Sequence, residues 1–157
     1  AGSTFIGLHK AEKSYFHRAM CTQDYSAVTA ACMMRKKVVF DQVGGFTEEL
    51  AVAFNDIDYC MKVRSLGKLV VYAPYAVLYH YESKSRGLED TPEKVARFNR
   101  EVAKFARRWP DILRDGDPYY NPNLTLRKSN FALRDLKKEG IGEPYELDGA
   151  IRALMNE

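Results

Sequence analysis

The sequence lacks several features that would place it in a particular class of protein. No apolar run approaches the roughly 20 residues that a membrane-spanning helix needs, so we expect no transmembrane segment. The net charge of +3, from 24 Lys and Arg against 21 Asp and Glu, is too small to indicate a nucleic-acid-binding protein. No C-x-x-C pair occurs among the 3 cysteines, which argues against a zinc site. We interpret them as reduced thiols of a cytoplasmic protein.

Internal repeats, low-complexity stretches and an initiator methionine are also missing. The 157 residues suffice for one domain with a hydrophobic core. The predicted strands are too few for a complete doubly wound sheet. We therefore expect the chain to be part of a longer protein.

What is present is an alternation of helical and strand-like segments, which predicts an α/β or α+β fold. Hydrophobic patterns and breaker residues predict the following elements: a buried strand over 25–34, a short helix over 36–43 ended by Gly44 and Gly45, a helix over 55–66 stopped by Gly67, two short strands over 68–81 separated at Pro74, and a helix from Pro92 to about Trp109.

The region after the long helix is predicted differently. Residues 114–126 contain two prolines and several turn formers and predict an ordered loop. From Arg127 onward the chain is more charged, and two weakly amphipathic segments, 129–140 and 145–156, predict a helical tail. We expect the domain to comprise 1–126 and the tail to comprise 127–157.

The stretch Asn55-Asp56-Ile57-Asp58 crowds three polar side chains into the start of the predicted helix. Asn55 is a favourable N-cap, and Asp58 then stands where an acidic side chain completes a capping box. No capping role is predicted for Asp56, which is therefore the candidate catalytic residue of this stretch. The string also spells D-x-D, but it opens a helix instead of ending a strand, so we do not interpret it as a metal site.

Further candidates lie later in the chain. His80 ends a predicted strand beside a polar loop, where an imidazole could bind a divalent metal or could simply be a surface residue. Ser85 and Arg86 in that loop suit phosphate oxygens, with a solvated loop as the equal alternative. The tyrosines of "DPYYNPN" could stack on a sugar ring or pin the loop onto the core. Trp109 is expected to pack at a helix end.

Taken together, residues 27–87 resemble the acceptor-side half of family 2 glycosyltransferases with the GT-A fold. The shared features are an apolar strand, a short helix, the string G-G-F-x-E-E, an acidic helix start and a strand ending in P-x-A-x-x-x-H. The later "RW" and "DPYYNPNL" (117–124) resemble a bacterial polysaccharide-associated subgroup. The likeness covers roughly 25–125 and implies a partial GT-A-like mixed sheet flanked by helices.

This resemblance implies an enzyme that transfers a sugar from a nucleotide-sugar donor to a glycan acceptor hydroxyl, usually with inversion. It implies Asp56 as general base and His80 as a ligand of a divalent metal, Mg²⁺ or Mn²⁺. The remaining residues implied to contact substrate are Glu48, Glu49, Asp58, Ser85 and Arg86; for Glu48 and Glu49 a helix-surface position is the equal alternative.

One departure from the family matters for activity. No nucleotide-binding β/α half with a strand-end D-x-D is found, so we expect the isolated chain to be inactive. The alternatives are a non-catalytic carbohydrate-binding or assembly module on the same scaffold, or a pseudo-enzyme interaction domain. A sheet lacking its other half leaves an unpaired edge, so we also expect self-association.

Overall fold

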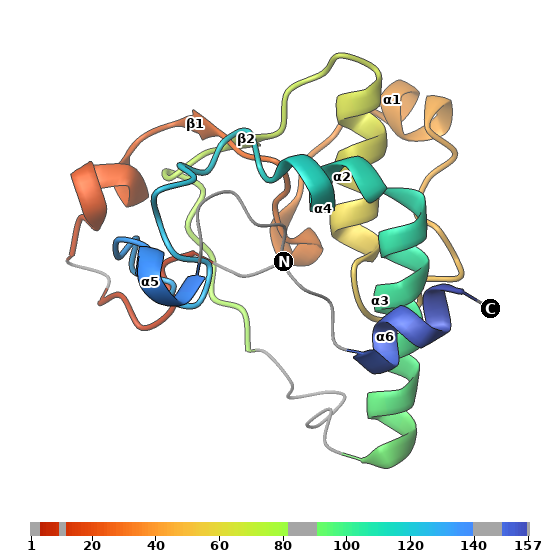
Figure 1. Ribbon diagram of the computed structural model, residues 1–157. Helices are drawn as coiled ribbons and strands as arrows, with labels where there is room; N and C mark the ends of the chain where they lie inside the picture. The colour runs from red at the N-terminus through yellow and green to blue at the C-terminus, as the bar shows by residue number, and fades with distance from the viewer. Residues whose placement is uncertain (1–3, 10–11, 82–90, 140–148, 157) are drawn as a thin grey trace.

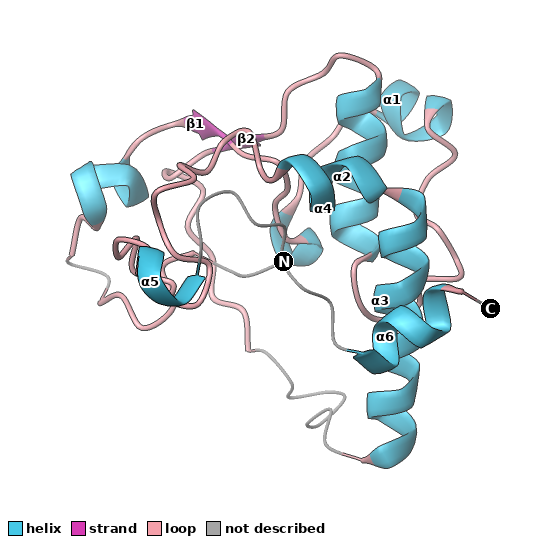
Figure 2. Ribbon diagram, in the orientation of Figure 1, coloured by secondary structure: helices cyan, strands magenta, loops and turns pink. Residues whose placement is uncertain are grey.

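The computed structural model describes residues 4–9, 12–81, 91–139 and 149–156 (Figure 1). Within these ranges the chain is a mixed α/β structure in which helices predominate (Figure 2). The elements, in chain order, are the 3₁₀ helix η1 (Tyr15–Met20), β1 (Gln23–Asp24), the 3₁₀ helix η2 (Ala30–Cys32), α1 (Lys37–Gln42), α2 (Asn55–Ser65), β2 (Val71–Tyr72), α3 (Pro92–Arg108), α4 (Pro110–Asp115), α5 (Leu136–Glu139) and α6 (Gly149–Met155).

The sheet is much smaller than the sequence predicted. Strands β1 and β2 pair antiparallel, with Gln23 opposite Tyr72 and Asp24 opposite Val71. The backbone amide of Tyr25 adds one more bond, to the carbonyl of Val70 (2.9 Å). The predicted strand over 25–34 is wrong, because this segment turns into η2, and the segment after Pro74 is not a strand either. A strand needs a partner for its backbone groups, and neither segment is paired along its length: in the described residues β1 pairs with β2, and Leu124 forms an isolated antiparallel bridge with Leu133.

The short helix predicted over 36–43 is confirmed as α1. It ends at two successive glycines, Gly44 and Gly45, whose φ angles of +72° and +66° are the left-handed values that close helices. Val39 and Val43 pack on the core as expected, whereas Val38 is exposed.

Helix α2 is the centre of the molecule and is confirmed close to its predicted bounds. Its buried residues, Asp58 to Met61 and Val63, lie all around its axis, as in a helix surrounded by other elements. One side joins Tyr59, Cys60 and Val63 to Val70. The other side joins Met61 to Leu50 and to Phe105 of α3. The segments that contain Val70 and Phe105, which are far apart in the sequence, thus pack against the same helix.

Helix α3 is also confirmed, beginning at Pro92 with Thr91 as its N-cap. Its C-terminal half is the part buried in the core: Phe105 and Ala106 are buried, whereas Val95 and Phe98 are exposed. The sequence did not predict the burial of Glu101, whose carboxylate accepts a hydrogen bond from the Ala53 backbone amide (2.6 Å). This bond ties α3 to the segment that enters α2.

Helices α5 and α6 lie within the predicted helical tail, and α6 packs against α3 (Figure 1). The loop after α4 is held in place by polar contacts with α2 and its surroundings. Ser26 Oγ donates to Asp117 Oδ1 (2.6 Å) and accepts from Arg64 (2.9 Å). The loop is thus ordered, as predicted.

Two further expectations concern the chain as a whole. All three cysteines are free, and burial raises the pKa of the Cys60 thiol. Among the helices of the described ranges, none combines the length and the apolar character required to cross a bilayer.

Candidate functional site

The candidate site forms where the chain enters α2. Phe54, and not Asn55, is the N-cap, and it takes a left-handed conformation with φ of +64°. Its ring lies 5.3 Å from that of Phe105 and 5.7 Å from that of Phe98, between ring centroids. These contacts and the bond from Ala53 to Glu101 fix the approach to the helix. The predicted capping by Asn55 and Asp58 is therefore wrong: the N-cap residue is Phe54, and it makes no side-chain capping hydrogen bond.

Asp56 lies in the first turn of α2 and is half-buried. Its Oδ1 accepts a hydrogen bond from the Ile57 backbone amide (2.8 Å), and its Oδ2 accepts one from the Ala30 amide of η2 (3.1 Å). No ion pair to Asp56 is found within the described ranges. A carboxylate has about four lone-pair positions, so each oxygen retains one for another donor. The carboxylate is therefore oriented by two amides and still able to accept a proton.

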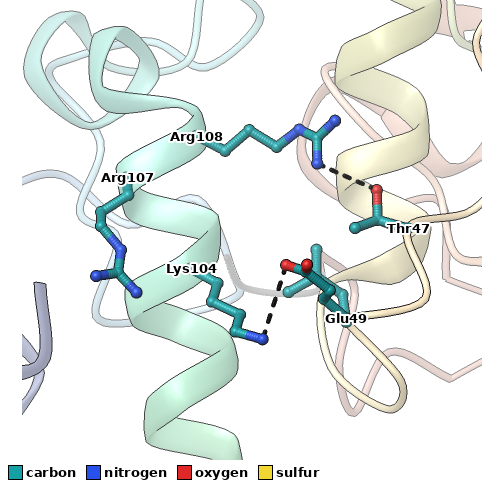
Figure 3. A pocket seen from close by; sticks show the side chains of 6 residues that line it. Thr47, Glu49, Lys104, Arg107 and Arg108 are labelled. Carbon is teal, nitrogen blue, oxygen red and sulfur yellow. Dashed lines mark hydrogen bonds and ion pairs between the residues drawn. The ribbon is translucent and has the colours of Figure 1, made fainter. Parts of the chain in front are cut away.

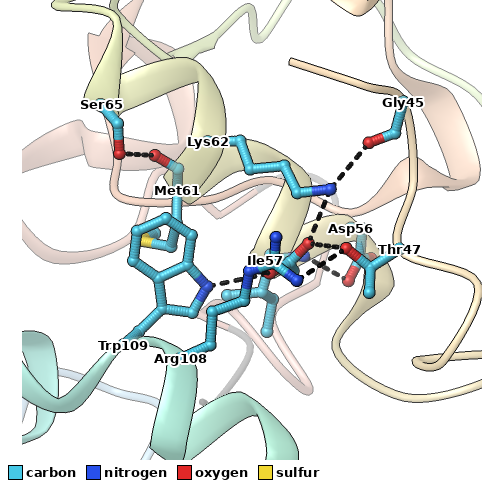
Figure 4. A network of polar contacts seen from close by, with 10 residues as sticks. Gly45, Thr47, Asp56, Ile57, Met61, Lys62, Ser65, Arg108 and Trp109 are labelled. Atoms are coloured by element: carbon cyan, nitrogen blue, oxygen red, sulfur yellow. Dashed lines mark hydrogen bonds and ion pairs between the residues drawn. The ribbon is translucent and has the colours of Figure 1, made fainter.

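Asp58 has the opposite environment: its side chain is completely buried. Figure 4 shows the side chains of Thr47, Lys62, Arg108 and Trp109 converging from different segments at the start of α2. Thr47 Oγ1 donates to its Oδ2 (2.6 Å), and the indole Nε1 of Trp109 donates to its Oδ1 (2.9 Å). Lys62 Nζ lies 3.3 Å from Oδ2 and Arg108 Nε lies 3.2 Å from Oδ1. We call these five residues the Asp58 cluster. It joins α2, the segment before α2 and the end of α3.

The protonation state of Asp58 follows from these contacts. Burial alone would raise the pKa of Asp58, because it disfavours the charged form. The hydrogen bonds from Thr47 and Trp109 and the charges of Lys62 and Arg108 act in the other direction and prevail, so the pKa lies below its ordinary value of 3.8. Asp58 is therefore a buried anion at neutral pH, with protein donors on both oxygens.

Glu48 and Glu49 lie on the segment between α1 and α2 and are both exposed. Glu49 Oε2 is 3.7 Å from Lys104 Nζ on α3. Beside this pair is a hollow of about 340 Å³. Its lining comes from the segment before α2 and from the last turns of α3: Thr47, Glu49, Leu50, Lys104, Arg107 and Arg108 (Figure 3).

His80, the predicted metal ligand, belongs neither to the Asp58 cluster nor to the lining of the hollow. His80 is exposed and lies outside any strand. Ser85 and Arg86 lie outside the described residues. Over the ranges that the structure describes, no group of three or more His, Cys, Asp or Glu is placed to hold a metal ion. The described residues thus do not form a divalent-metal site by themselves.

The aromatic residues of the predicted loop are engaged within the protein. The Tyr120 hydroxyl donates to the Thr125 carbonyl (3.0 Å), and its ring stacks on Phe131. The Tyr119 ring lies 5.3 Å from the Arg64 guanidinium carbon. These contacts favour the loop-pinning alternative over sugar stacking. Trp109 caps the C-terminus of α3, as predicted, but its hydrogen bond to Asp58 was not predicted.

Sequence reasoning missed the cations of α3 as site residues. Lys104, Arg107 and Arg108 recur at the three- and four-residue spacing that places side chains on one helix face. That spacing was the available signal. Nothing in the sequence indicated that these cations share a hollow with Thr47 and Glu49, because those two residues lie more than 50 positions earlier in the chain.

Comparison with known proteins shows what the chain is similar to. The chain is 57% identical over 122 residues to a protein of Sinorhizobium fredii that is named only as uncharacterized protein y4gI. It is 34% identical over 119 residues to the O-antigen biosynthesis protein RfbC of Myxococcus xanthus. Each match covers 76% of this chain. A third match, 32% over 69 residues and 44% of this chain, is to the N-acetylglucosaminyl-diphospho-decaprenol L-rhamnosyltransferase of Mycobacterium tuberculosis.

These relatives are much longer than the region they share with the chain. The chain spans 13% of the first, 9% of the second and 22% of the third. No protein-family model matches the chain, and no solved structure matches it. The similarities support a glycosyltransferase-like protein, in agreement with the resemblance of residues 27–87. The assignment to family 2 and to the GT-A fold stays a prediction.

Proposed function

We propose that the chain is the acceptor-side part of an inverting family 2 glycosyltransferase with a GT-A-like fold. The whole protein would transfer a sugar from a nucleotide-sugar to an acceptor hydroxyl during bacterial polysaccharide synthesis. Similarity to an O-antigen biosynthesis protein and to a rhamnosyltransferase supports the class of reaction. The structural observation that carries the proposal is the Asp56 carboxylate, which two backbone amides orient while leaving it able to accept a proton.

In this mechanism Asp56 acts as general base. A sugar hydroxyl is a weak nucleophile until its proton is removed, and a positioned carboxylate can accept that proton as the oxygen attacks the anomeric carbon. The bond from that carbon to the nucleoside diphosphate breaks as the new glycosidic bond forms. The Ala30 and Ile57 amides hold the carboxylate in place at the N-terminus of α2.

The other predicted residues take supporting roles in the proposal. Glu48 and Glu49, both exposed before α2, would face the acceptor, and Ser85 and Arg86 would contact phosphate. Asp58 would act on substrate indirectly, as a positioning residue that fixes the first turn of α2. Were the whole enzyme to use Mg²⁺ or Mn²⁺, His80 would need ligands from beyond the described residues.

The test is Asp56→Asn in the full-length gene product, with sugar transfer measured from a radiolabelled nucleotide-sugar. Loss of a general base should lower kcat by about a hundredfold or more. Asn keeps one oxygen for one of the two amides and leaves the other amide without its acceptor, so the circular dichroism spectrum should be unchanged while stability falls by about 1 kcal/mol.

The matched control is Asp41→Asn, which removes an exposed carboxylate of α1 that pairs only with Lys37. Transfer at the normal rate by this variant is expected. Normal transfer by Asp56→Asn would remove Asp56 from the mechanism. A wild-type protein that binds glycan but transfers no sugar would instead support the non-catalytic carbohydrate-binding module.

A further inference from the structure

One face of α3 contacts the two residues that precede α2. Phe98, Glu101 and Phe105 recur at the three- and four-residue spacing that places side chains on the same side of a helix. Glu101 Oε2 accepts the hydrogen bond from the Ala53 amide (2.6 Å). The rings of Phe98 and Phe105 lie beside that of Phe54. All three side chains thus contact the dipeptide that stands immediately before the first residue of α2.

Glu101 is an unusual residue for such a contact, because it is only 4% exposed. Removing a carboxylate from water is costly unless it gains a strong partner. The Arg97 Nε atom lies 3.9 Å from Oε1, which is beyond hydrogen-bond distance. The bond from the Ala53 amide is short and has a carboxylate acceptor, which makes it stronger than a bond to a neutral group.

This bond is made next to a backbone conformation that bulky residues rarely adopt. Phe54 has φ of +64° and ψ of 2°, in the left-handed region where a Cβ atom crowds the following carbonyl group. Such a conformation persists only where the surrounding structure fixes it. The Phe54 carbonyl accepts the first hydrogen bond of the helix, from the Asp58 amide (2.8 Å). The direction in which α2 begins therefore depends on this strained residue.

Asp56 depends on the direction in which α2 begins, because its two hydrogen bonds come from different segments. The Ile57 amide belongs to the same turn of α2, so this donor moves together with the carboxylate. The Ala30 amide belongs to η2, so its bond to Oδ2 forms only while α2 begins in the observed direction. Relaxation of Phe54 would rotate the first turn relative to η2 and separate Oδ2 from the Ala30 amide.

We propose that Glu101 is a positioning residue for Asp56. It acts through the Ala53 amide and the left-handed Phe54 to keep the first turn of α2 aligned with η2. Pairing of a buried amide would by itself explain an acceptor for Ala53. It does not explain why that acceptor stands on α3 between the two aromatic residues that contact Phe54. The catalytic consequence rests on the proposed function, whereas the effect on the hydrogen bonds of Asp56 does not.

The first measurement is sugar transfer by the full-length gene product carrying Glu101→Met. Met matches Glu in length but offers no oxygen to the Ala53 amide. We expect kcat to fall about tenfold, because the base is displaced, and KM to change less than about twofold, because a buried side chain does not contact substrate. Glu101→Gln keeps an oxygen for the amide and should retain at least about half of kcat. An equal fall in both variants would overturn the proposal.

The second measurement does not depend on sugar transfer. Heteronuclear NMR of the 157-residue chain follows the amide protons of Ala30 and Ile57, which donate to Asp56. An amide proton moves upfield when its hydrogen bond to a carboxylate lengthens. In Glu101→Met the Ala30 signal should therefore move upfield, whereas the Ile57 signal should move less. An unchanged Ala30 signal would show that Asp56 keeps its place without Glu101 and would overturn the proposal.

A double variant tests whether Glu101 acts through Asp56. Once Asp56 can no longer accept a proton, its alignment with η2 has little effect on the rate. Glu101→Met should then lower the residual kcat of Asp56→Asn by less than about twofold. A further fall of about tenfold would mean that Glu101 acts on another group and would overturn the proposal. Normal transfer by Asp56→Asn alone would refute the proposed function, whereas the Ala30 signal would still decide whether Glu101 orients the carboxylate.

A control variant separates positioning from the stability of α3. Ala103→Gly weakens the same helix at a buried position that lies outside the apolar cluster containing Phe54 and Phe105. It should lower Tm and leave both kcat and the Ala30 signal unchanged. A fall in kcat equal to that of Glu101→Met would reduce the effect to helix stability and overturn the proposal.

Phe98→Ala tests the same contact at a position where folding tolerates substitution. Phe98 is 41% exposed, and its ring lies beside that of Phe54. We expect kcat to fall about threefold and the Ala30 signal to move in the same direction as in Glu101→Met. Val95→Ala changes a similarly exposed apolar residue of α3 and should transfer sugar at the normal rate. Equal losses in Phe98→Ala and Val95→Ala would remove the contact with Phe54 from the mechanism and overturn the proposal.

Discussion

The start of α2 carries two carboxylates, two residues apart, whose surroundings are opposite. Asp56 is half-buried, bonded only to backbone amides and open to a further donor. Asp58 is completely buried and contacts two hydrogen-bond donors and two cations. The chemical role proposed for Asp56 therefore depends on a neighbour whose own role is to hold the helix in place.

Asp58→Asn should destabilise the protein by about 3 kcal/mol, because it leaves the charges of Lys62 and Arg108 facing a buried neutral group. Urea unfolding monitored by the fluorescence of Trp109 would measure the change in the free energy of unfolding. The exposed pair of Asp41 with Lys37 is the control, and Asp41→Asn should cost no more than about 0.5 kcal/mol. Similar losses in the two variants would show that the Asp58 cluster contributes no more than a surface pair.

The lowered pKa of Asp58 also predicts a pH dependence. The folded protein binds this proton less tightly than the unfolded chain, whose carboxyl titrates near 3.8. Its contribution to stability is therefore complete above that value and is lost as pH falls through the lowered pKa of the folded state. Asp58→Asn should show a flatter acid limb in a plot of unfolding free energy against pH. An unchanged acid limb would assign the acid sensitivity to other groups.

At the scale of the elements, the turn after α1 offers a comparison between two neighbouring glycines. Both have positive φ, but a Cβ on Gly45 would lie 2.9 Å from Cζ of Phe40, whereas a Cβ on Gly44 would meet nothing within 4 Å. Gly44→Ala should cost about 1 kcal/mol through backbone strain alone. Gly45→Ala should cost about 2–3 kcal/mol, because the Phe40 ring must also move. Equal melting temperatures of the two variants would contradict this difference.

Three helices were predictable from the sequence, whereas the sheet was predictable only at β2, which lies in the first of the two strands expected over 68–81. Helices α1, α2 and α3 can be recognised from the spacing of their apolar residues and from residues that begin or end helices, such as Gly44, Gly67 and Pro92. This is possible because the hydrogen bonds of a helix join residues close together in the sequence. The segment 25–34 looks like a strand by composition, yet strand formation depends on a partner elsewhere in the chain. Its Val28 and Met33 still pack on the core, so the apolar character was real although the conformation differed.

The candidate site was predicted in part for the same reason. The first turn of α2 could be located because it is a local motif, but the elimination that singled out Asp56 rested on capping by Asn55 and Asp58, which the structure does not show. The roles of Thr47, Arg108 and Trp109 could not be predicted, because they come from contacts between distant segments. The left-handed Phe54 could not be predicted either, since the aromatic contacts with α3 that accompany it are tertiary.

At the scale of the whole molecule, the segment after Pro74 presents an apolar surface to solvent. The side chains of five of its residues are between 68% and 83% exposed: Tyr75, Val77, Leu78, Tyr79 and Tyr81. Contiguous exposed apolar groups of this kind mark surfaces that other chains or segments cover. This observation gives the predicted self-association a specific location.

Sedimentation velocity should therefore show a sedimentation coefficient that rises with protein concentration. Val77→Lys should suppress the rise, because a charged residue in an extended apolar segment disfavours pairing between chains. Val38→Lys is the control, since Val38 is similarly exposed but lies on α1. A wild-type monomer at every concentration would refute the prediction, and equal suppression by both variants would remove the segment as the interface.

The two carboxylates of α2 also constrain how this region can change in length. Each residue of a helix advances about 100° around its axis, so residues two apart face nearly opposite directions. With Asp58 anchored in its cluster, one residue inserted or deleted between the two aspartates would rotate the Asp56 position by about a quarter turn, away from the Ala30 amide. Related sequences should consequently tolerate substitutions in this turn more readily than any change in its number of residues.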